Sequence, residues 1–453
     1  MIAPVPARPA NGRFLRRARP AALAGALCAA CALPAAAQQQ PAPGGEFNIG
    51  AQLNWEDDEF SLGLPINMQL IRATRSQQLR FSAALPIRIH PGGEDVIDLP
   101  SAQAGFVWRR ESRQTALDFQ ANYLRTELDQ LRFDDSTDFV VLDEGQRQDT
   151  DLRLGVEFGR ASRFGGEFSV GLSQRDYRDT TERSLVDNKG RNADLNLRAQ
   201  VSPLIEARAG LSVLEIDSDP GGTDTTEHRA TVSAGLIIDK VTTADIALGY
   251  SRIERDRFLF GDDSVEGVTA SFTLSRARPD GQWTLDYVTD PATAGRRHTI
   301  EIGRTILRQS GELSFGFGAT KREGGSIDPV FRLSASQQLN STAAVNVNLQ
   351  RQAVTDDDGD EAINTDFQAS YVQQVGEATE FRTGILYRET DYRSGPSPDA
   401  SRYGLDLLVS HAVTSKWTLT AGYEGTRSRN DAGERSDDDR IFIGLGTTYQ
   451  WRP

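Results

Sequence analysis

Apolar and polar side chains alternate along most of this chain with a period of two residues. In the segment 441–451, for example, Ile441, Ile443 and Leu445 occupy one set of alternate positions, while Gly444 and Gly446 occupy the other. Successive side chains of a β-strand point to opposite faces, so this spacing gives a strand with one apolar face and one polar face. Similar segments of roughly 10 to 15 residues, each followed by turn residues, recur along nearly the whole chain.

The length of this run of segments bears on the fold class. Roughly twenty or more strand segments follow one another, and no helical pattern interrupts them. A soluble sandwich would pack its apolar faces together. A run of this length fits better as one closed sheet, with the apolar face toward lipid and the polar face toward water. The sequence therefore predicts an all-β protein, a single closed transmembrane antiparallel β-barrel.

Short turns and longer connections alternate along the chain, as in bacterial barrels with short periplasmic turns and long outer loops. Ten short turns plus a strand at each end predict about 22 strands (range 18–22), and the first hairpin turns at 56–59. An even strand number places both termini in the periplasm. The short turns are expected at 73–76, 111–113, 161–163, 202–203, 240–242, 279–281, 309–311, 339–341, 376–377 and 414–416. The longer, more acidic connections are expected at 90–100, 129–148, 179–191, 217–227, 257–264, 355–361, 392–401 and 429–438.

Aromatic residues fall near the predicted strand ends, where rings at the two lipid–water interfaces are expected. One set follows the short turns and consists of Phe164, Trp283, Phe381 and Trp417; the other lies near the opposite ends and consists of Tyr123, Tyr177, Tyr250, Tyr387 and Tyr423. Inward aromatic residues are few, with Phe442 and Tyr392 as the candidates. Inward aromatic platforms would favour sugars as the transported molecules.

The polar set of alternate positions provides candidates for lining the lumen. We expect Leu195, Leu197, Leu405, Leu407, Ile441 and Ile443 to contact lipid, with Asp406 and Gly444 inward. A wall of mixed charges and amides suits hydrated solutes, or its side chains brace the wall through ion pairs. Segment 129–148 is the candidate constriction, because its apolar residues could pack inward; an outward β-extension is the alternative. The lumen-lining candidates are Asp151, Arg153, Glu157, Asp194, Asn196, Arg198, Asn346, Asn348 and Gln350.

The first 37 residues match a secretory signal, with a basic start, a short Ala-rich apolar stretch and an Ala35-Ala36-Ala37 cleavage site. Segment 38–45 is predicted as a flexible leader and 46–453 as the barrel, with no separate plug domain. Both cysteines, Cys28 and Cys31, lie in the signal, so no disulfide or thiolate site is expected after cleavage. Loss of its five arginines and no acid takes the formal net charge from −14 to −19, which argues against nucleic acid.

Nothing in the sequence indicates catalysis, a cofactor or a metal. The four histidines, His90, His228, His298 and His411, are scattered, and none has a histidine or cysteine two or four residues on. Two acidic runs, 356–361 and 437–439, lack the spacing of a calcium-binding loop. They favour solvated hairpin tips over divalent-ion bridges to lipopolysaccharide. The sequence therefore predicts no enzyme.

The C-terminus resembles the signal read by the outer-membrane insertion machinery, in which a glycine precedes two aromatic residues. Gly446, Tyr449 and Trp451 carry this resemblance, which departs from the usual pattern at Gly444 and in the added Arg452-Pro453. The mature chain is also similar to β-barrel porins of proteobacteria, some of which accompany exopolysaccharide export. The resemblance implies integral insertion in the outer membrane of a Gram-negative bacterium. The implied partners are lipid, lipopolysaccharide, the insertion machinery and polysaccharide-export components.

The resulting functional hypothesis is a porin-like channel for passive passage of hydrophilic solutes or secreted polysaccharide. The alternative is a structural or adhesive surface barrel whose acidic loops bind lipopolysaccharide or other surface partners.

Overall fold

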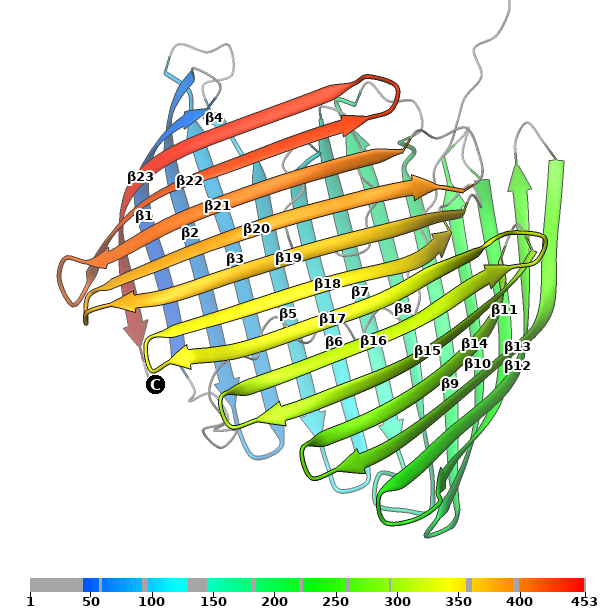
Figure 1. Ribbon diagram of the computed structural model, residues 1–453. Coiled ribbons are helices and arrows are strands. Elements are labelled where there is room, and N and C mark those ends of the chain that lie inside the picture. The colour runs from blue at the N-terminus through cyan, green and yellow to red at the C-terminus, as the bar shows by residue number, and fades with distance from the viewer. Residues whose placement is uncertain are drawn as a thin grey trace, which may run out of the picture.

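The computed structural model describes 44–56, 59–91, 97–128, 145–180, 185–219, 223–257, 261–292, 295–355, 361–393 and 399–451. Every strand in these residues belongs to one antiparallel sheet (Figure 1). Within the described residues, no helix is long and apolar enough to cross a membrane. The predicted signal lies outside the described residues. The first strand starts at Gly44, two positions before the predicted start of the barrel at 46.

The first half of the sheet contains twelve strands. They are β1 (Gly44–Glu56), β2 (Glu59–Ala73), β3 (Gln77–Ile89), β4 (Ile97–Asp98), β5 (Ser101–Glu111), β6 (Thr115–Glu127), β7 (Gln146–Phe158), β8 (Phe164–Arg178), β9 (Asn188–Ser202), β10 (Ile205–Ser218), β11 (Thr223–Ile237) and β12 (Thr242–Arg257).

The second half continues in the same up-and-down order. Its strands are β13 (Gly261–Arg278), β14 (Gly281–Ala292), β15 (Gly295–Arg308), β16 (Gly311–Arg322), β17 (Ile327–Asn340), β18 (Ala343–Thr355), β19 (Glu361–Val375), β20 (Thr379–Tyr392), β21 (Ala400–Ala412), β22 (Trp417–Asn430) and β23 (Arg435–Trp451).

The sheet closes because β1 pairs with β23 along its length, from Gly45 opposite Trp451 to Glu56 opposite Arg440. β4 is a two-residue strand inside the connection between β3 and β5, so the wall has 22 strands. Figure 1 shows β23 (red) beside β1 (blue) in a barrel of steeply tilted strands. The prediction of a closed antiparallel barrel of 22 strands is confirmed.

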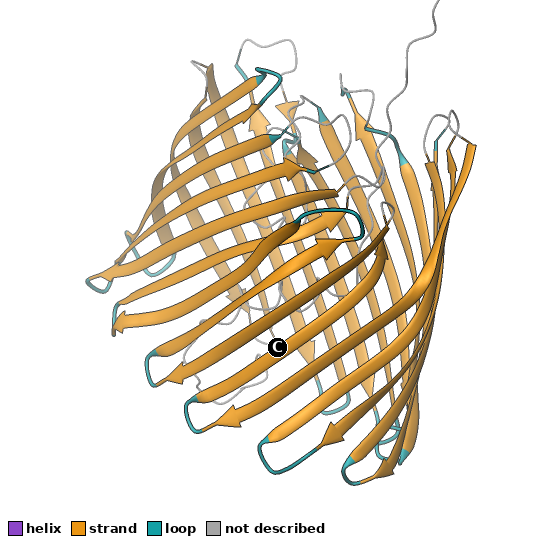
Figure 2. Ribbon diagram, turned by 45° about the vertical axis from the view of Figure 1, so that its right-hand side comes forward, coloured by secondary structure: helices purple, strands orange, loops and turns teal. Residues whose placement is uncertain are grey.

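All ten predicted short turns join consecutive strands and line the lower rim in Figure 2. Side chains stabilise several of them. In the turn between β11 and β12, the Asp239 carboxylate accepts hydrogen bonds from the backbone N–H groups of Val241 and Thr242, both at 2.8 Å. The bond from Val241 N–H and the hydroxyl of Thr242 lower the pKa of Asp239. The described ends of the sheet, at Gly44 and Trp451, lie at this same rim.

Several strands extend further than predicted at the opposite rim. Segments 217–227 and 429–438 were expected as long connections, but β11 already begins at Thr223 and β23 at Arg435. Charged residues continue the pairing here, since Arg427 lies directly opposite Asp437, with an ion pair of 3.5 Å. Cross-strand pairs of opposite charge stabilise a sheet in water. The strands therefore outrun the roughly 9 to 11 residues needed to span a bilayer.

Cross-strand register divides the side chains between two faces. Leu195, lying opposite Leu211, shares the outer face with Leu197, and the remaining predicted lipid-facing residues lie there too. Ile441 exposes 62 % of its surface on this face. Of the predicted interfacial rings, Tyr177 is the exception. It lies opposite Arg147 on the inner face, because the two-residue alternation along β8 puts it on the same face as Glu167.

The closing seam has contacts on both faces of the sheet. On the inner face, Gln450 Nε2 donates to Glu46 Oε2 at 3.1 Å, and the Thr448 hydroxyl donates to Asn48. On the outer face, the Trp451 indole covers Gly45 and leaves no room for a side chain there. Glycine at position 45 therefore allows the last aromatic residue to lie flat across the first strand.

The register makes a direct prediction about labelling. A cysteine at Asn196 should react with a water-soluble maleimide, because the position is exposed on the inner face, whereas a cysteine at Leu197 should not. On the outer face, Leu405→Arg near mid-membrane should destabilise the barrel by roughly 2 to 4 kcal/mol. A reversed labelling pattern would mean that the register is displaced by one residue.

Closure makes a second prediction. Deletion of 449–453 removes the last pairs between β23 and β1, so the chain should remain an unassembled, protease-sensitive species. Removal of Arg452 and Pro453 alone should be tolerated. Heat-modifiable migration on a gel separates these outcomes. A compact, heat-modifiable barrel after the larger deletion would contradict both closure through this end and the assignment of Gly446, Tyr449 and Trp451 as the insertion signal.

Candidate functional site: the inner wall of the barrel

The polar face of the sheet is its concave, inner face. Arg332 on β17 lies 2.8 Å from Glu301 on β15 and 3.7 Å from Asp286 on β14, which is three strands away. Arg208 on β10 similarly reaches Asp245 on β12 at 3.2 Å. Contacts that bypass intervening strands need side chains that converge, as they do inside a curved sheet. Ionic side chains therefore line the interior.

Six of the predicted lining residues form one patch on β7 and β9. Asp151, Arg153 and Glu157 share the inner face of β7, and Arg153 lies 3.9 Å from Glu167 on β8. Asn196 of β9 lies opposite the same Glu167. Asp194 accepts hydrogen bonds from the Asn192 amide at 2.9 Å and from the Ser169 hydroxyl at 3.4 Å.

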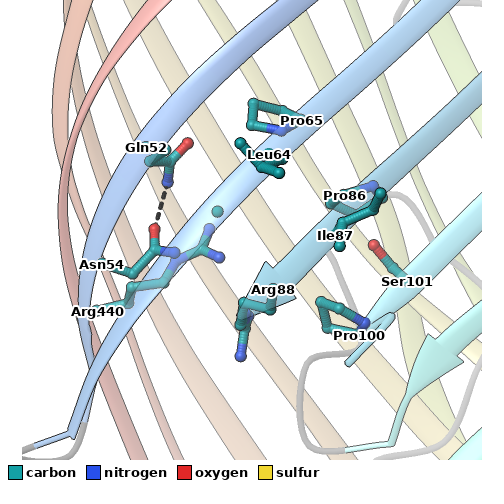
Figure 3. Close-up of a pocket in the computed structure, with 11 residues that line it drawn as sticks. Gln52, Asn54, Leu64, Pro65, Pro86, Ile87, Arg88, Pro100, Ser101 and Arg440 are labelled. Atoms are coloured by element: carbon teal, nitrogen blue, oxygen red, sulfur yellow. Dashed lines mark hydrogen bonds between the residues drawn. The ribbon is translucent and has the colours of Figure 1, made fainter. Parts of the chain in front are cut away.

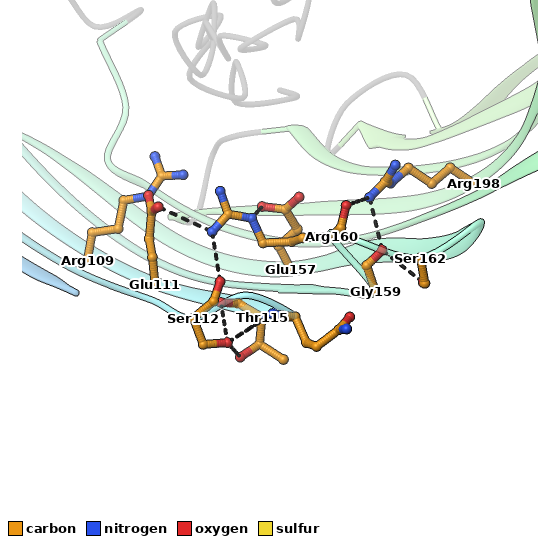
Figure 4. Close-up of polar contacts among 10 residues, drawn as sticks. Arg109, Glu111, Ser112, Thr115, Glu157, Gly159, Arg160, Ser162 and Arg198 are labelled. Carbon is orange, nitrogen blue, oxygen red and sulfur yellow. Dashed lines mark hydrogen bonds and ion pairs between the residues drawn. The ribbon is translucent and has the colours of Figure 1, made fainter. Parts of the chain in front are cut away.

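The sixth residue of this patch, Arg198, braces a turn. Its guanidinium donates to the backbone carbonyls of Gly159 and Arg160, each at 3.2 Å, in the turn between β7 and β8. Arg160 in turn pairs with Glu157 at 3.3 Å and Glu111 at 3.2 Å (Figure 4). The bracing interpretation therefore fits Arg198 and Glu157. Arg153 and Asn196 remain exposed at the inner surface.

The third predicted group is distant from this patch. Asn346, Asn348 and Gln350 share the inner face of β18, opposite residues of β17 and β19. Gln350 donates to Gln352 at 2.6 Å. The register therefore assigns all nine candidates to the inner face, but in two separate regions.

Arginine dominates the positive charge of the chain, because only Lys189, Lys240, Lys321 and Lys416 of its 50 basic residues are lysines. Buried inner-face arginines form ion pairs, such as Arg388 with Asp366 at 2.6 Å and Arg147 with Asp149 at 2.7 Å. Guanidinium groups suit such sites, since they stay charged and present several donors in a fixed plane. The inner wall is thus stiffened by fixed, largely compensated charges.

A hollow near the closing seam was not anticipated from the sequence (Figure 3). It has a volume of about 140 Å³ and is lined in part by Pro65, Pro86 and Arg88. Pro65 and Pro86 lie directly opposite each other on β2 and β3. The available signal was a proline in the middle of each of two consecutive apolar strands, a position where proline normally marks an irregularity.

Three further segments predicted from the sequence are the candidate constriction and the two acidic runs. Most of the candidate constriction 129–148 lies outside the described residues; 146–148 belong to β7. Of the acidic run 356–361, residues 356–360 also lie outside them. The run 437–439 was predicted as a hairpin tip, but it belongs to β23, where Asp439 accepts a hydrogen bond from Tyr423 and pairs with Arg427. Strand pairing explains this correction.

The enclosed space is wide. For 22 strands spaced about 4.8 Å apart and tilted by about 40°, the backbone diameter is roughly 45 Å. Side chains from opposite walls do not meet across that width. The inner wall therefore provides a polar, charged surface around a broad lumen, suited to contact with hydrated molecules.

Comparisons with known proteins identify the fold. No family model and no curated protein matches the chain. Among solved structures, it is similar to the ferric-catecholate import receptor Fiu of E. coli K12, with a TM-score of 0.58 and 10% identity over 91% of this chain and 82% of that one. It is also similar to the FrpB iron transporter of Neisseria meningitidis, with a TM-score of 0.60 and 9% identity over 90% and 81%. BauA, the ferric preacinetobactin receptor of Acinetobacter baumannii, gives 0.58 and 8% over 90% and 80%.

These similarities show that the chain folds as an outer-membrane β-barrel. They give no support to the resemblance to porins of exopolysaccharide export. At identities of 8 to 10% they describe the fold and leave the transported molecule open.

Proposed function

We propose that the protein is an outer-membrane channel for the passive passage of hydrophilic solutes. The observation that carries this proposal is a closed wall of 22 strands whose polar, ionised face is turned inward. Such a face needs water or a polar cargo, because uncompensated charges and amides are costly in an apolar environment. Compensated pairs such as Arg332 with Glu301 give a wall of low specificity.

A second candidate function is uptake of an iron chelate. The similar solved structures favour it, since their names describe receptors for ferric chelates and an iron transporter. Their barrels match this chain over about nine-tenths of its length. Under this alternative the described wall would surround a dedicated binding site for the chelate. A structural or adhesive barrel is the third hypothesis, and it predicts no transport.

Single-channel recording of the full chain in planar bilayers tests the proposal. A channel should give ohmic conductance in simple salt without an added ligand. An adhesive barrel should give none. A dedicated iron-chelate receptor should bind a probe such as ferric enterobactin with no such basal conductance. Absence of conductance in a folded, heat-modifiable preparation would contradict the passive channel.

Ion selectivity provides a sharper prediction. With a net charge of −19 after signal removal, the channel should prefer cations, and this preference should weaken as salt rises. Arg332→Gln removes a positive charge from the inner wall and should move the reversal potential further in the cation-selective direction. The loss of stability should stay below about 1 kcal/mol, because the Arg332 side chain is half-exposed.

Arg252→Gln is the matched control for this measurement. Arg252 and Arg332 have equally exposed side chains, 52 % in each case, and each pairs with a glutamate. Arg252 lies on the outer face of β12, on the same face as Ile246 and Leu248. Equal shifts from the two variants would show that the inner wall does not line the conducting path.

A further inference from the structure

A continuous groove follows the inner wall at the closing seam. Two adjoining hollows of about 140 and 180 Å³ share Gln52 and Pro65 among their lining residues. The first extends across β2 and β3 to Pro100 and Ser101, and the second extends across β1 to β23 and β22. We define these two hollows together as the seam groove. Figure 3 shows the side chains that line the end of the seam groove where Arg88 lies.

Small residues make the groove deep. Gly50, Gly63, Gly444 and Gly446 all lie on the inner face, where most neighbouring positions carry side chains. A Cβ atom on Gly446 would meet its closest neighbour at 3.7 Å, an ordinary van der Waals distance, so even a small side chain would fit at this part of the floor. The floor is therefore formed by backbone, half-buried at Gly50 and Gly446 and buried at Gly63 and Gly444.

Two prolines interrupt the hydrogen-bond ladder along this floor. Register between β1 and β2 stops at Ile49 opposite Ile66 and resumes at Gln52 opposite Gly63, so Pro65 and Leu64 have no paired residue on β1. Register between β3 and β5 ends at Ala84 opposite Gln103, just before Pro86. Proline has no N–H to donate. The β2–β3 register runs through both prolines, so pairing is interrupted only toward β1 and toward β5. Backbone polar groups that no ladder pairs need other partners.

Amides and hydroxyls border the floor. Asn48 and Asn67 lie directly opposite each other on β1 and β2. Gln52 donates to Asn54 at 2.6 Å, which donates to Ser61 at 3.2 Å. On the β22 side, the hydroxyl side chains of Thr418 and Thr420 line the groove. These groups offer both donors and acceptors and carry no charge.

The arginines near the groove are compensated. Arg88, only 7% exposed, pairs with Glu56 at 3.0 Å, and Arg440 pairs with Glu424. Beside Arg440, the half-buried ring of Phe442 lies against Gly422 on the inner face, with the guanidinium 5.5 Å from the ring centroid. The groove therefore has little net charge and an aromatic surface next to it.

We propose that the seam groove binds a chain of uncharged sugar rings. Such a chain presents hydroxyls that exchange hydrogen bonds with the amides and hydroxyls along the groove, and flat C–H faces that pack on proline and aromatic rings. A polyanion is disfavoured, because the nearby arginines already have carboxylate partners. An apolar ligand is disfavoured, because it would leave the side-chain amides along the groove without hydrogen bonds. These amides belong to Asn48, Gln52, Asn54 and Asn67. An uncharged oligosaccharide would then be the cargo of the proposed channel, and this role of the groove rests on the proposed function.

Calorimetric titration of the purified full barrel with maltoheptaose tests the groove directly. Asn48→Ala with Asn67→Ala should weaken binding by at least about tenfold, because two hydrogen-bonding side chains are lost. Asn348→Ala with Gln368→Ala is the matched control. These two amides also lie directly opposite each other on the inner face, one exposed and one half-buried, but on β18 and β19. The control should stay within about twofold of the parent.

Asn67→Ala alone provides a second test if the double variant misfolds, because Asn67 is exposed in the lumen and its loss should not affect folding. It should retain heat-modifiable migration and weaken binding by about fivefold. Equal losses of maltoheptaose affinity in the groove and control variants, or no loss in either, would overturn the proposal that the seam groove binds sugar. So would tighter binding of a matched oligogalacturonate than of maltoheptaose. Titration does not need conductance, so a folded barrel that binds sugar without conducting would contradict the channel and leave the groove supported.

Discussion

The fold depends on one constraint: every backbone N–H and C=O group that faces lipid must find a partner within the protein. A strand cannot satisfy these groups alone, so the sheet must close on itself. Here closure joins β1 to β23 over a register that runs from Gly45 to Glu56 on the first strand. The Trp451 indole over Gly45 and the bond from Gln450 to Glu46 hold the two faces of that seam.

The other features follow from closure. Once the sheet is a cylinder, period-two alternation gives an apolar outside and a polar inside. With 22 strands the inside is too wide for side chains to fill, so its charges meet along the wall rather than across it. Pairs such as Arg332 with Glu301 neutralise the wall locally and leave a hydrated lumen. The same seam contains the proline breaks, so the seam groove lies where the barrel closes.

Local pattern was sufficient to predict the strands and the ten short turns, because each depends on residues near one another in the chain. The closed antiparallel barrel followed from the constraint that a sheet in lipid can have no open edge. Local pattern also assigned the faces of Asn196 and Leu197 correctly. It failed where strands run beyond the membrane, as at Asp437, since water and lipid accept the same alternation. The seam groove could not be predicted, because it depends on which residues lie opposite Pro65 in the closed sheet.

Covalent trapping of the seam tests the account most directly. In a chain whose Cys28 and Cys31 are replaced by serine, cysteines at Asn48 and Thr448 would lie directly opposite each other on β1 and β23. The distance between directly opposed positions in a sheet suits a disulfide. The account predicts near-complete oxidation in the assembled barrel, giving a circular chain that migrates differently from the reduced form. A folded barrel in which this pair stays reduced, while cysteines at Thr420 and Gly444 on β22 and β23 do cross-link, would contradict closure through this seam.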